Sequence, residues 1–197
     1  AEQSGMMQGD IVIEKYKKNP RDVDKNGDGK VQYVMLEGEQ GHQDASIRTE
    51  YSVKRLVDSG IKVEKLGSEV ANWSRTEASE KVDRWIEKYN DKVELIISNN
   101  DDMALGAIDV LNKSKIKNNM PLIVGVDGIK DALKAIDNGE MTGTVISDAY
   151  KQGKAIFDTA LRVSSGNILD NDNGIDARYI RIPHVIVTKE NVGEYIK

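Results

Sequence analysis

The sequence contains no cysteine, and this absence excludes disulfide bonds, zinc ribbons, iron–sulfur clusters and thiol catalysis. Aromatic residues make up only 5% of the 197 residues, and only three residues are proline. Apolar runs such as Leu95–Ile97 are too short to cross a bilayer, so we expect no membrane insertion. Basic residues are in the minority, since 28 Lys and Arg against 33 Asp and Glu give a net charge of −5. We therefore expect no nucleic-acid partner, because binding to phosphates needs a basic face.

The chain does have the composition of a soluble globular protein, with 39% hydrophobic and 31% charged residues. Its length is enough for one large domain or two small ones. Residues 1–15 lack the basic stretch and apolar core of a signal peptide, and we expect a chain that is cytosolic, mature or truncated.

Strand-like and helix-like segments alternate along most of the chain. The apolar pattern predicts strands over residues 31–36, 61–66, 94–98, 122–126, 144–146, 178–182 and 185–187. It predicts helices over residues 2–18, 44–59, 76–88, 102–111, 130–137, 150–163 and 188–196, and a polar loop over 166–174. Five strand-then-helix repeats predict the α/β class, with a parallel sheet flanked by helices on both faces.

Residues 24–32 match the spacing of a calcium-binding loop, in which oxygen-bearing side chains alternate and a glycine then allows a sharp turn. The candidate ligands are Asp24, Asn26, Asp28, the carbonyl of Lys30, and Gln32. A register that starts at Asp22 is less favourable, because it puts a lysine at a ligand position.

Position 12 of this motif is Met35, which has no oxygen to offer. Two interpretations stay open: a solvated acidic turn without metal, or a loop completed by a carboxylate from elsewhere. Glu94 is a candidate for that carboxylate if its strand lies beside Val31–Leu36.

Polar side chains follow the expected strands at their carboxyl ends, where open parallel sheets bind ligands. The segments are 38–44 with Arg48, then Trp73, Asn99–Asp101, Asp127 and Ser147–Asp148. Carboxylates accept hydrogen bonds from sugar hydroxyls, Arg and Asn donate them, and an indole offers a flat apolar surface. The pattern as a whole therefore indicates a polyhydroxyl ligand.

Each of these residues also has a structural interpretation. Asp44 and Arg48 could form a surface ion pair, and Asp44 and Asp101 are natural helix N-caps. Trp73 could pack at a rim, and Trp85 lies on the apolar stripe of its helix. No catalytic motif follows a strand and the chain has only two histidines, so we expect no enzyme.

Three segments resemble the bacterial galactose/glucose-binding proteins, which are receptors for ABC transport and chemotaxis with the two-lobed type I periplasmic-binding-protein fold. The segments are DKNGDGKVQYVMLEGEQGHQDASIRT, VELIISNNDDMALGA and IVGVDGIKDAL. The resemblance implies a structural calcium ion held by Asp24, Asn26, Asp28, Lys30, Gln32 and Glu94. It implies contacts with D-glucose or D-galactose from His42, Asp44, Arg48, Trp73, Asn100 and Asp127. A further sugar-contacting asparagine of that family aligns with Ser147.

The resemblance also implies a domain organisation. Residues 1–146 correspond to the C-terminal lobe with its calcium loop, residues 147–181 to part of an otherwise missing N-terminal lobe, and residues 182–197 to the return into the C-terminal lobe. We therefore expect a chain truncated at its N-terminus that binds calcium well, and sugar weakly or not at all. The expected partners of the full-length parent are an ABC transporter permease and a chemoreceptor, in a periplasmic or extracytoplasmic location, with lipid anchoring of the parent left open.

Two other functions share parts of this pattern. The effector-binding core of a sugar-responsive repressor has the same fold, but no basic or helix-turn-helix segment precedes it here. A fragment of a carbohydrate-active enzyme would need paired carboxylates, whose separation the sequence does not fix. The preference between glucose and galactose also stays open at this point.

Overall fold

The computed structural model describes residues 1–114, 116, 119–166 and 179–196. Its centre is a six-stranded sheet with the strand order β2-β1-β3-β4-β5-β6. The strands are β1 (Val31–Glu37), β2 (Val63–Val70), β3 (Leu95–Ser98), β4 (Leu122–Asp127), β5 (Gly143–Ile146) and β6 (Val185–Thr188). The first five run parallel, and β6 pairs with β5 in the antiparallel direction. The predicted α/β class and mainly parallel sheet are confirmed.

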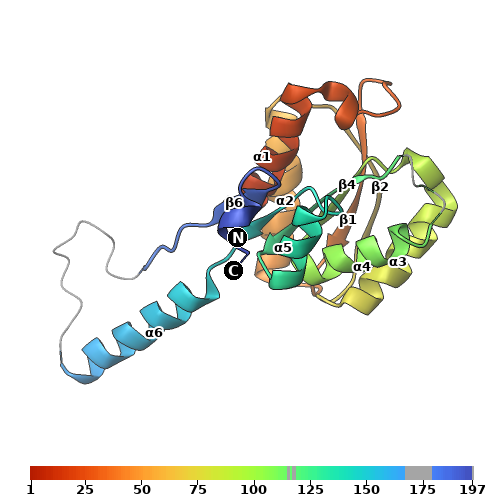
Figure 1. Cartoon of the computed structure of the whole chain (residues 1–197). Coiled ribbons are helices and arrows are strands. Elements are labelled where there is room, and N and C mark those ends of the chain that lie inside the picture. Colours follow the sequence, from red (N-terminus) through yellow and green to blue (C-terminus); the bar gives the residue numbers. More distant parts are fainter. Residues whose placement is uncertain (115, 117–118, 167–178, 197) are drawn as a thin grey trace.

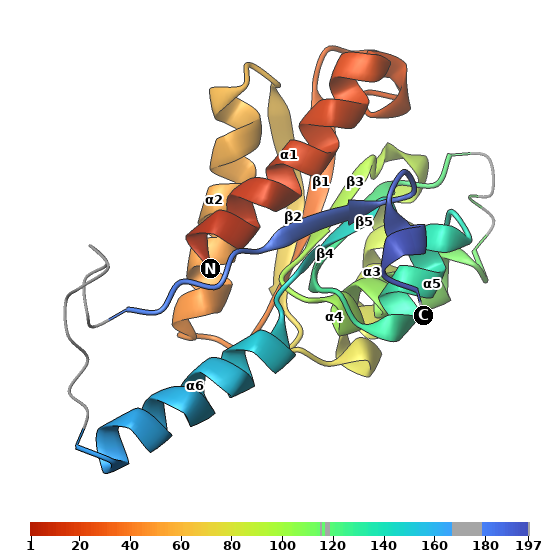
Figure 2. The ribbon, with the colours of Figure 1, turned by 60° about the vertical axis from the view of Figure 1, so that its left-hand side comes forward.

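Helices cover both faces of this sheet (Figures 1 and 2). They are α1 (Glu2–Lys18), α2 (Gln43–Asp58), α3 (Arg75–Tyr89), α4 (Asp101–Leu111), α5 (Lys130–Asp137) and α6 (Ala149–Ser164), with short 3-10 turns at Pro20–Asp22, Asn90–Lys92 and Val192–Glu194. The helices α1 and α2 pack on one face, and α3, α4 and α5 on the other. The result is a three-layer arrangement.

The central strands β1, β3 and β4 are buried on both faces, and their sequences reflect this. In β1, Val34 and Leu36 belong to the core under α3 and α4, whereas Tyr33 and Met35 belong to the core under α1 and α2. Successive side chains of a strand point to opposite faces, so a strand covered on both sides needs apolar residues at nearly every position. This explains the short continuous apolar runs of the sequence.

Two predicted elements at the end of the chain are wrong. Residues 179–182 of the predicted strand 178–182 form no strand, and Arg178 lies outside the described residues, as do residues 167–174 of the predicted loop. The predicted helix 188–196 is only a 3-10 turn at Val192–Glu194. Asn191 explains the difference, because its side chain accepts a hydrogen bond from the Thr188 N–H and donates one to the Ile186 carbonyl. This clasp turns the backbone directly after β6, so Thr188 ends a strand and caps no helix.

The strand β2 also differs from its prediction over 61–66. It starts two residues later and extends to Val70, which pairs with Glu37 of β1. The register shifts between Tyr33 and Val34, so β2 contains one extra residue opposite β1. Backbone pairing to β1 therefore keeps residues 67–70 in the sheet although their side chains show no strand-like alternation.

The helix α6 leaves the sheet after β5 and extends away from the rest of the molecule (Figures 1 and 2). None of its residues is buried, and Ile156, Phe157 and Leu161 are among the exposed large apolar side chains. The assignment of residues 147–181 to a second lobe stays a prediction, and residues 167–178 of it lie outside the described part. In the described part of the chain, no helix is long and apolar enough to span a bilayer.

Candidate ligand-binding site

The six residues predicted to contact sugar lie at the carboxyl ends of four neighbouring strands. The residues are His42, Asp44 and Arg48 at the start of α2 after β1, Trp73 after β2, Asn100 between β3 and α4, and Asp127 at the end of β4. Because parallel strands end at the same edge of a sheet, four separate stretches of sequence meet there. The structure brings all six residues into one connected group.

Arg48 is the centre of this group. Its Nη1 donates a 2.7 Å hydrogen bond to the Asn99 carbonyl and lies 4.0 Å from Oδ1 of Asp127. Its Nη2 lies 3.9 Å from Oδ2 of Asp44, and the guanidinium carbon lies 6.0 Å from the centroid of the Trp73 ring. The Arg48 side chain is only 11% exposed. One guanidinium on α2 thus links the segments that follow β2 and β3 to the end of β4.

Trp73 forms a wall of the site. Its ring meets the His42 ring edge-on, with centroids 5.1 Å apart and an interplanar angle of 77°. Asn72 and Trp73 both have positive φ, 47° and 62°, which turns the backbone so that the indole folds back over β1. Gly38 makes room for it, because a Cβ there would collide with the indole. Asn100 donates a 3.4 Å hydrogen bond to the Trp73 carbonyl.

The helix N-caps at the site are not the aspartates that the sequence suggested. His42 caps α2, since its Nδ1 accepts a hydrogen bond from the Asp44 N–H at 3.2 Å. Asn100 caps α4, since its Oδ1 accepts from the Met103 N–H at 3.0 Å. The capping prediction for Asp44 and Asp101 is therefore wrong, and the Asp44 carboxylate stays free to face Arg48. An accepting Nδ1 places the ring proton of neutral His42 on Nε2.

Asp127 combines an unusual backbone with an unusual charge. It has a φ of 126°, a conformation that residues other than glycine rarely adopt. Partial burial raises the pKa of its carboxyl to about 6; the nearby Arg48 opposes this shift and Asp102 adds to it. A carboxyl with this pKa is ionised at neutral pH and accepts hydrogen bonds from hydroxyl groups.

Asp101 lies buried beneath the site, although the sequence suggested a strand-end position or a helix cap for it. Its side chain is fully buried, with Oδ1 accepting from the Thr144 hydroxyl at 2.6 Å and Oδ2 from the N–H groups of Gly128 and Ile129 at 2.7 and 3.0 Å. Burial raises its pKa to about 7, against the effect of these hydrogen bonds. Gly125 was the available signal, because a Cβ there would collide with the Asp101 carboxylate.

Asn99 was part of a predicted strand-end segment, but no role of its own was predicted for it. It is buried, and its Oδ1 accepts a 3.0 Å hydrogen bond from the Gly38 N–H. Its amide also donates to the Thr49 hydroxyl at 3.1 Å. Together with the bond from Arg48 to its carbonyl, Asn99 fixes α2 and the end of β1 against the end of β3.

The candidate calcium loop lies at the opposite, amino end of β1. The strands β1 and β3 are neighbours, as the proposal for Glu94 required, and Glu94 is fully buried beside the loop. Its Oε1 accepts from the N–H groups of Lys25 and Asn26 at 2.7 and 3.0 Å, and its Oε2 accepts from the Gln32 N–H at 3.0 Å. The two distant segments therefore meet at one place.

The oxygen-bearing side chains of this loop converge through hydrogen bonds. The Asn26 amide donates to Oε1 of Gln32 at 2.9 Å, and the Gln32 amide donates to Oδ2 of Asp28 at 2.8 Å. The Asp24 carboxylate accepts from the Gly27 and Gly29 N–H groups. Among the described residues, no group of three or more His, Cys, Asp or Glu side chains has a metal-binding arrangement. Calcium binding, which would also use amide and carbonyl oxygens, stays a prediction.

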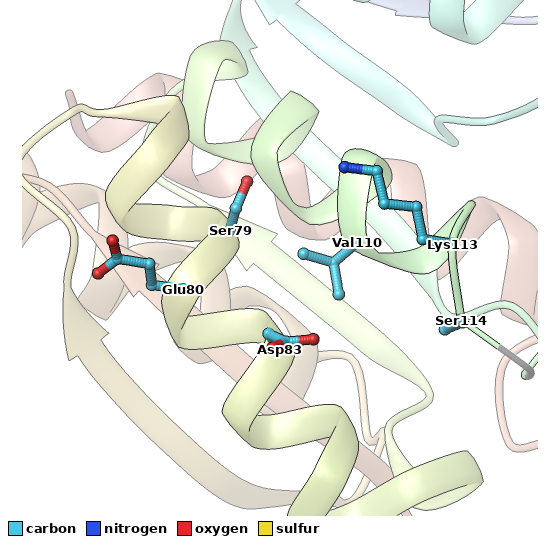
Figure 3. A pocket seen from close by; sticks show the side chains of 6 residues that line it. All are labelled: Ser79, Glu80, Asp83, Val110, Lys113 and Ser114. Atoms are coloured by element: carbon cyan, nitrogen blue, oxygen red, sulfur yellow. The ribbon is translucent and has the colours of Figure 1, made fainter.

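Other hollows lie away from this edge of the sheet. A pocket of about 370 Å³ is lined by residues of α3, α4 and the turn after α4 (Figure 3). The lining residues are Ser79, Glu80, Asp83, Val110, Lys113 and Ser114. None of the predicted site residues reaches it.

A parallel α/β sheet whose carboxyl edge gathers an indole, a guanidinium and several carboxylates defines a ligand-binding lobe. Comparison with known proteins identifies the family. The model of the periplasmic binding protein domain matches residues 1–168, and the chain belongs to this family. Its architecture is that of the type I periplasmic binding proteins.

Individual relatives support the same assignment. The D-galactose/methyl-galactoside binding periplasmic protein of Haemophilus influenzae is 41% identical over 99% of this chain and 59% of its own length. The xylitol-binding protein of Mycolicibacterium smegmatis is 30% identical over 83% of this chain and 44% of its own length. The solved structure of an ABC transporter solute binding protein from Bacillus halodurans with bound myo-inositol is 27% identical, with a TM-score of 0.78 over 100% of this chain and 61% of that one. The chain thus spans between 44% and 61% of the length of these relatives.

Proposed function

We propose that this chain is a sugar-binding lobe of a periplasmic receptor for ABC transport, with D-galactose or D-glucose as its ligand. One observation carries the proposal: four strand ends direct the groups around Arg48 toward a single edge of the sheet. The 41% identity to a protein named for D-galactose favours this sugar class among the ligands of its relatives.

The chemistry of the group suits a neutral ring with many hydroxyls. The Asp44 and Asp127 carboxylates accept hydrogen bonds from hydroxyl groups, while Arg48 and Asn100 donate them. Hydrogen bonds to ionised groups are about twice as strong as neutral ones. Trp73 offers the flat apolar surface that the C–H face of a pyranose needs. Each property of a sugar thus has a matching group at this edge.

The openness of this edge sets the expected affinity. The side chains of Asp44 and Asp127 are 49% and 38% exposed, so water competes for their hydrogen bonds. A ligand held by one lobe alone keeps one face in solvent. We therefore propose that this chain binds sugar with a dissociation constant of about 1 mM or weaker, which corresponds to about −4 kcal/mol.

We also propose that the loop at residues 24–32 holds a structural calcium ion together with Glu94. The donor set fits a hard cation, since it consists only of carboxylate, amide and carbonyl oxygens. A fully buried carboxylate without a cationic hydrogen-bond partner among the described residues supports this assignment. Asp24, Asn26, Asp28, Gln32, Glu94 and the Lys30 carbonyl would hold the ion, whose charge would stabilise the loop.

The functions of the whole protein follow as further proposals. A periplasmic or extracytoplasmic location, docking to an ABC transporter permease and a role in chemotaxis are expected of the full-length parent. They rest on family membership and on relatives longer than this chain.

A titration followed by backbone amide NMR tests the sugar proposal. D-galactose, D-glucose, xylitol and myo-inositol are each added, up to about 100 mM, to reach well above a millimolar dissociation constant. Shifts confined to residues around Arg48 and Trp73, strongest with the two hexoses, are expected. Asp127→Asn should weaken the response, whereas Asp131→Asn, an exposed aspartate of α5, should leave it unchanged. A flat titration with all four compounds contradicts the proposal.

A further inference from the structure

One buried carboxylate connects the segments that follow β3 and β4 with β5, close to the edge where the candidate site lies. Asp101 begins α4 directly after β3, and its hydrogen-bond donors belong to the turn after β4 and to Thr144 of β5. The side chain is fully buried, so it does not touch a ligand at the edge. None of the described ion pairs includes it. Its three partners are neutral donors from the turn after β4 and from β5, so the effect of Asp101 is on the position of these segments.

The bonds of Asp101 are adjacent in sequence to two of the candidate sugar contacts. Asn100 precedes Asp101, and Asp127 precedes Gly128, whose N–H donates to Oδ2. A shift of either segment would move one of these two side chains. The single carboxylate thus ties the segment that carries the donor Asn100, the N-cap of α4, to the turn that follows the acceptor Asp127 of β4.

The turn after β4 needs such a restraint. Asp127 has a φ of 126° and Gly128 a φ of 77°. A residue other than glycine rarely adopts such a conformation, and it persists there only where its surroundings hold it. Ile129, at the N-cap position of α5, offers no side-chain cap. The Asp101 carboxylate binds the N–H groups of Gly128 and Ile129 at once and so restrains the turn from another element.

We propose that Asp101 is a positioning residue for the sugar site, holding Asn100 and Asp127 at the separation that the ligand requires. This inference rests on the proposed sugar-binding function. The positioning depends on the acceptor oxygens of the Asp101 side chain rather than on its negative charge, because all three partners are neutral donors. An asparagine side chain has nearly the same shape as aspartate and keeps one acceptor oxygen, so Asp101→Asn should preserve the positioning of Asn100 and Asp127.

Hydrogen exchange in the absence of sugar is the first test. Asp101→Ala should reduce the protection of the Gly128 and Ile129 amides at least about tenfold, because their shared acceptor is lost. Asp101→Asn should keep this protection within about threefold of the wild-type chain. Thr144→Val keeps the side-chain volume but removes the hydroxyl that donates to Oδ1 of Asp101, so an intermediate loss of amide protection is expected. This variant also provides the test if Asp101→Ala does not fold. Unchanged protection in both the Ala and Val variants overturns the inference.

Sugar affinity is the second test, with a matched control for stability. Ile108→Ala makes a cavity in α4 and should lower the melting temperature with little change in the D-galactose dissociation constant. Asp101→Ala should weaken galactose binding at least about tenfold at a similar loss of stability, and Asp101→Asn should restore it. Equal weakening by Asp101→Ala and Ile108→Ala overturns the inference and leaves a purely structural role.

The two proposals fail in different ways. If the wild-type chain shows no response to any sugar, the proposed function fails. The positioning inference is then decided by ligand-free measurements, namely the amide exchange and the carboxyl ¹³C shift of Asp127. That shift should move in Asp101→Ala and stay in Asp101→Asn, and the opposite pattern overturns the inference.

Discussion

Nη1 of Arg48 and Oδ1 of Asp127 face each other at 4.0 Å across the carboxyl edge of the sheet. The pair joins α2 to the end of β4, although the residues are far apart in the sequence. The distance is longer than a hydrogen bond, so both groups keep hydrogen-bonding capacity for a third partner. Arg48 Nε, moreover, is buried and has no hydrogen-bond partner within the described residues. The guanidinium is therefore held in place by packing against Trp73 and by its bond to the Asn99 carbonyl.

Arg48→Lys should weaken galactose binding about tenfold or more, although it keeps the charge. A lysine ammonium is a point donor and does not bind the Asn99 carbonyl while also facing both Asp44 and Asp127. Amide NMR titration measures the dissociation constant. Arg84→Lys, an exposed arginine of α3 that pairs with Glu69, is the matched control and should bind as the wild-type chain does. Equal affinity of the Arg48→Lys variant would show that the planar guanidinium is not needed.

The layers of the fold could be predicted from the sequence because the apolar patterns of its buried strands and of its helices are both clear. Apolar runs buried on both faces mark strands such as β3, and an apolar stripe marks helices such as α5, whose boundaries were predicted without error. The two outer strands, β2 and β6, and the chain after β6 were harder to predict. Residues 67–70 enter β2 through their backbone pairing with β1, and the hydrogen bonds of Asn191 produce a turn where a helix was predicted.

The part of the site that depends on residue type was predicted from the sequence. The part that depends on contacts between distant residues was missed. The carboxylates, the guanidinium and the indole follow the strands directly, so their common edge could be deduced from a parallel sheet alone. The capping by His42 and the burial of Asp101 depend on which atoms meet across strands. The local sequence does not indicate such contacts between strands. The exception is a glycine in an apolar strand, such as Gly125, which leaves room for the Asp101 carboxylate.

The buried Asp101 should make stability depend on pH with a sign opposite to that of most carboxyl groups. Its pKa is about 7 in the folded chain, above the model-peptide value of 3.8, so the folded chain binds this proton more tightly than the unfolded chain. The free energy of unfolding therefore falls as pH rises from about 4 to 7, by at most about 4 kcal/mol. Asp127, with a pKa of about 6, acts in the same direction, whereas His184, whose pKa is lowered mainly by burial, opposes them.

Urea unfolding of the wild-type chain and the Asp101→Asn variant isolates this contribution. The stability of the wild-type chain relative to the variant should decrease between pH 4.5 and pH 7.5, a range that covers most of the interval between the pKa of the unfolded chain and that of the folded chain. Asp131→Asn removes an exposed carboxyl and should show no such change. A stability difference that stays constant over this range would show that Asp101 titrates normally.

Calcium should raise the melting temperature of the wild-type chain, and chelation should reverse the effect. A ligand at about 100 times its dissociation constant stabilises the folded state by about 2.7 kcal/mol. Glu94→Gln should abolish the response, because a fully buried carboxylate next to the loop is lost. Glu69→Gln, a carboxylate of β2 that faces Arg84, should respond as the wild-type chain does. An identical melting curve with calcium and with chelator in the wild-type chain would leave the loop as an acidic turn.

The helix α6 should be the least protected helix of the chain. It has no buried residue, and a helix of about 16 residues without packing is marginally stable in water. Hydrogen exchange should therefore be fast over Ala149–Ser164 and slow in α4, where Met103, Ala107 and Leu111 are fully buried. Limited trypsin treatment should cut at Lys154 and Arg162 before it cuts at Lys81 or Arg84 of α3, a helix whose buried face packs on the sheet. Slow exchange over α6, at the level of α4, would show that in solution another surface covers Ile156 and Phe157.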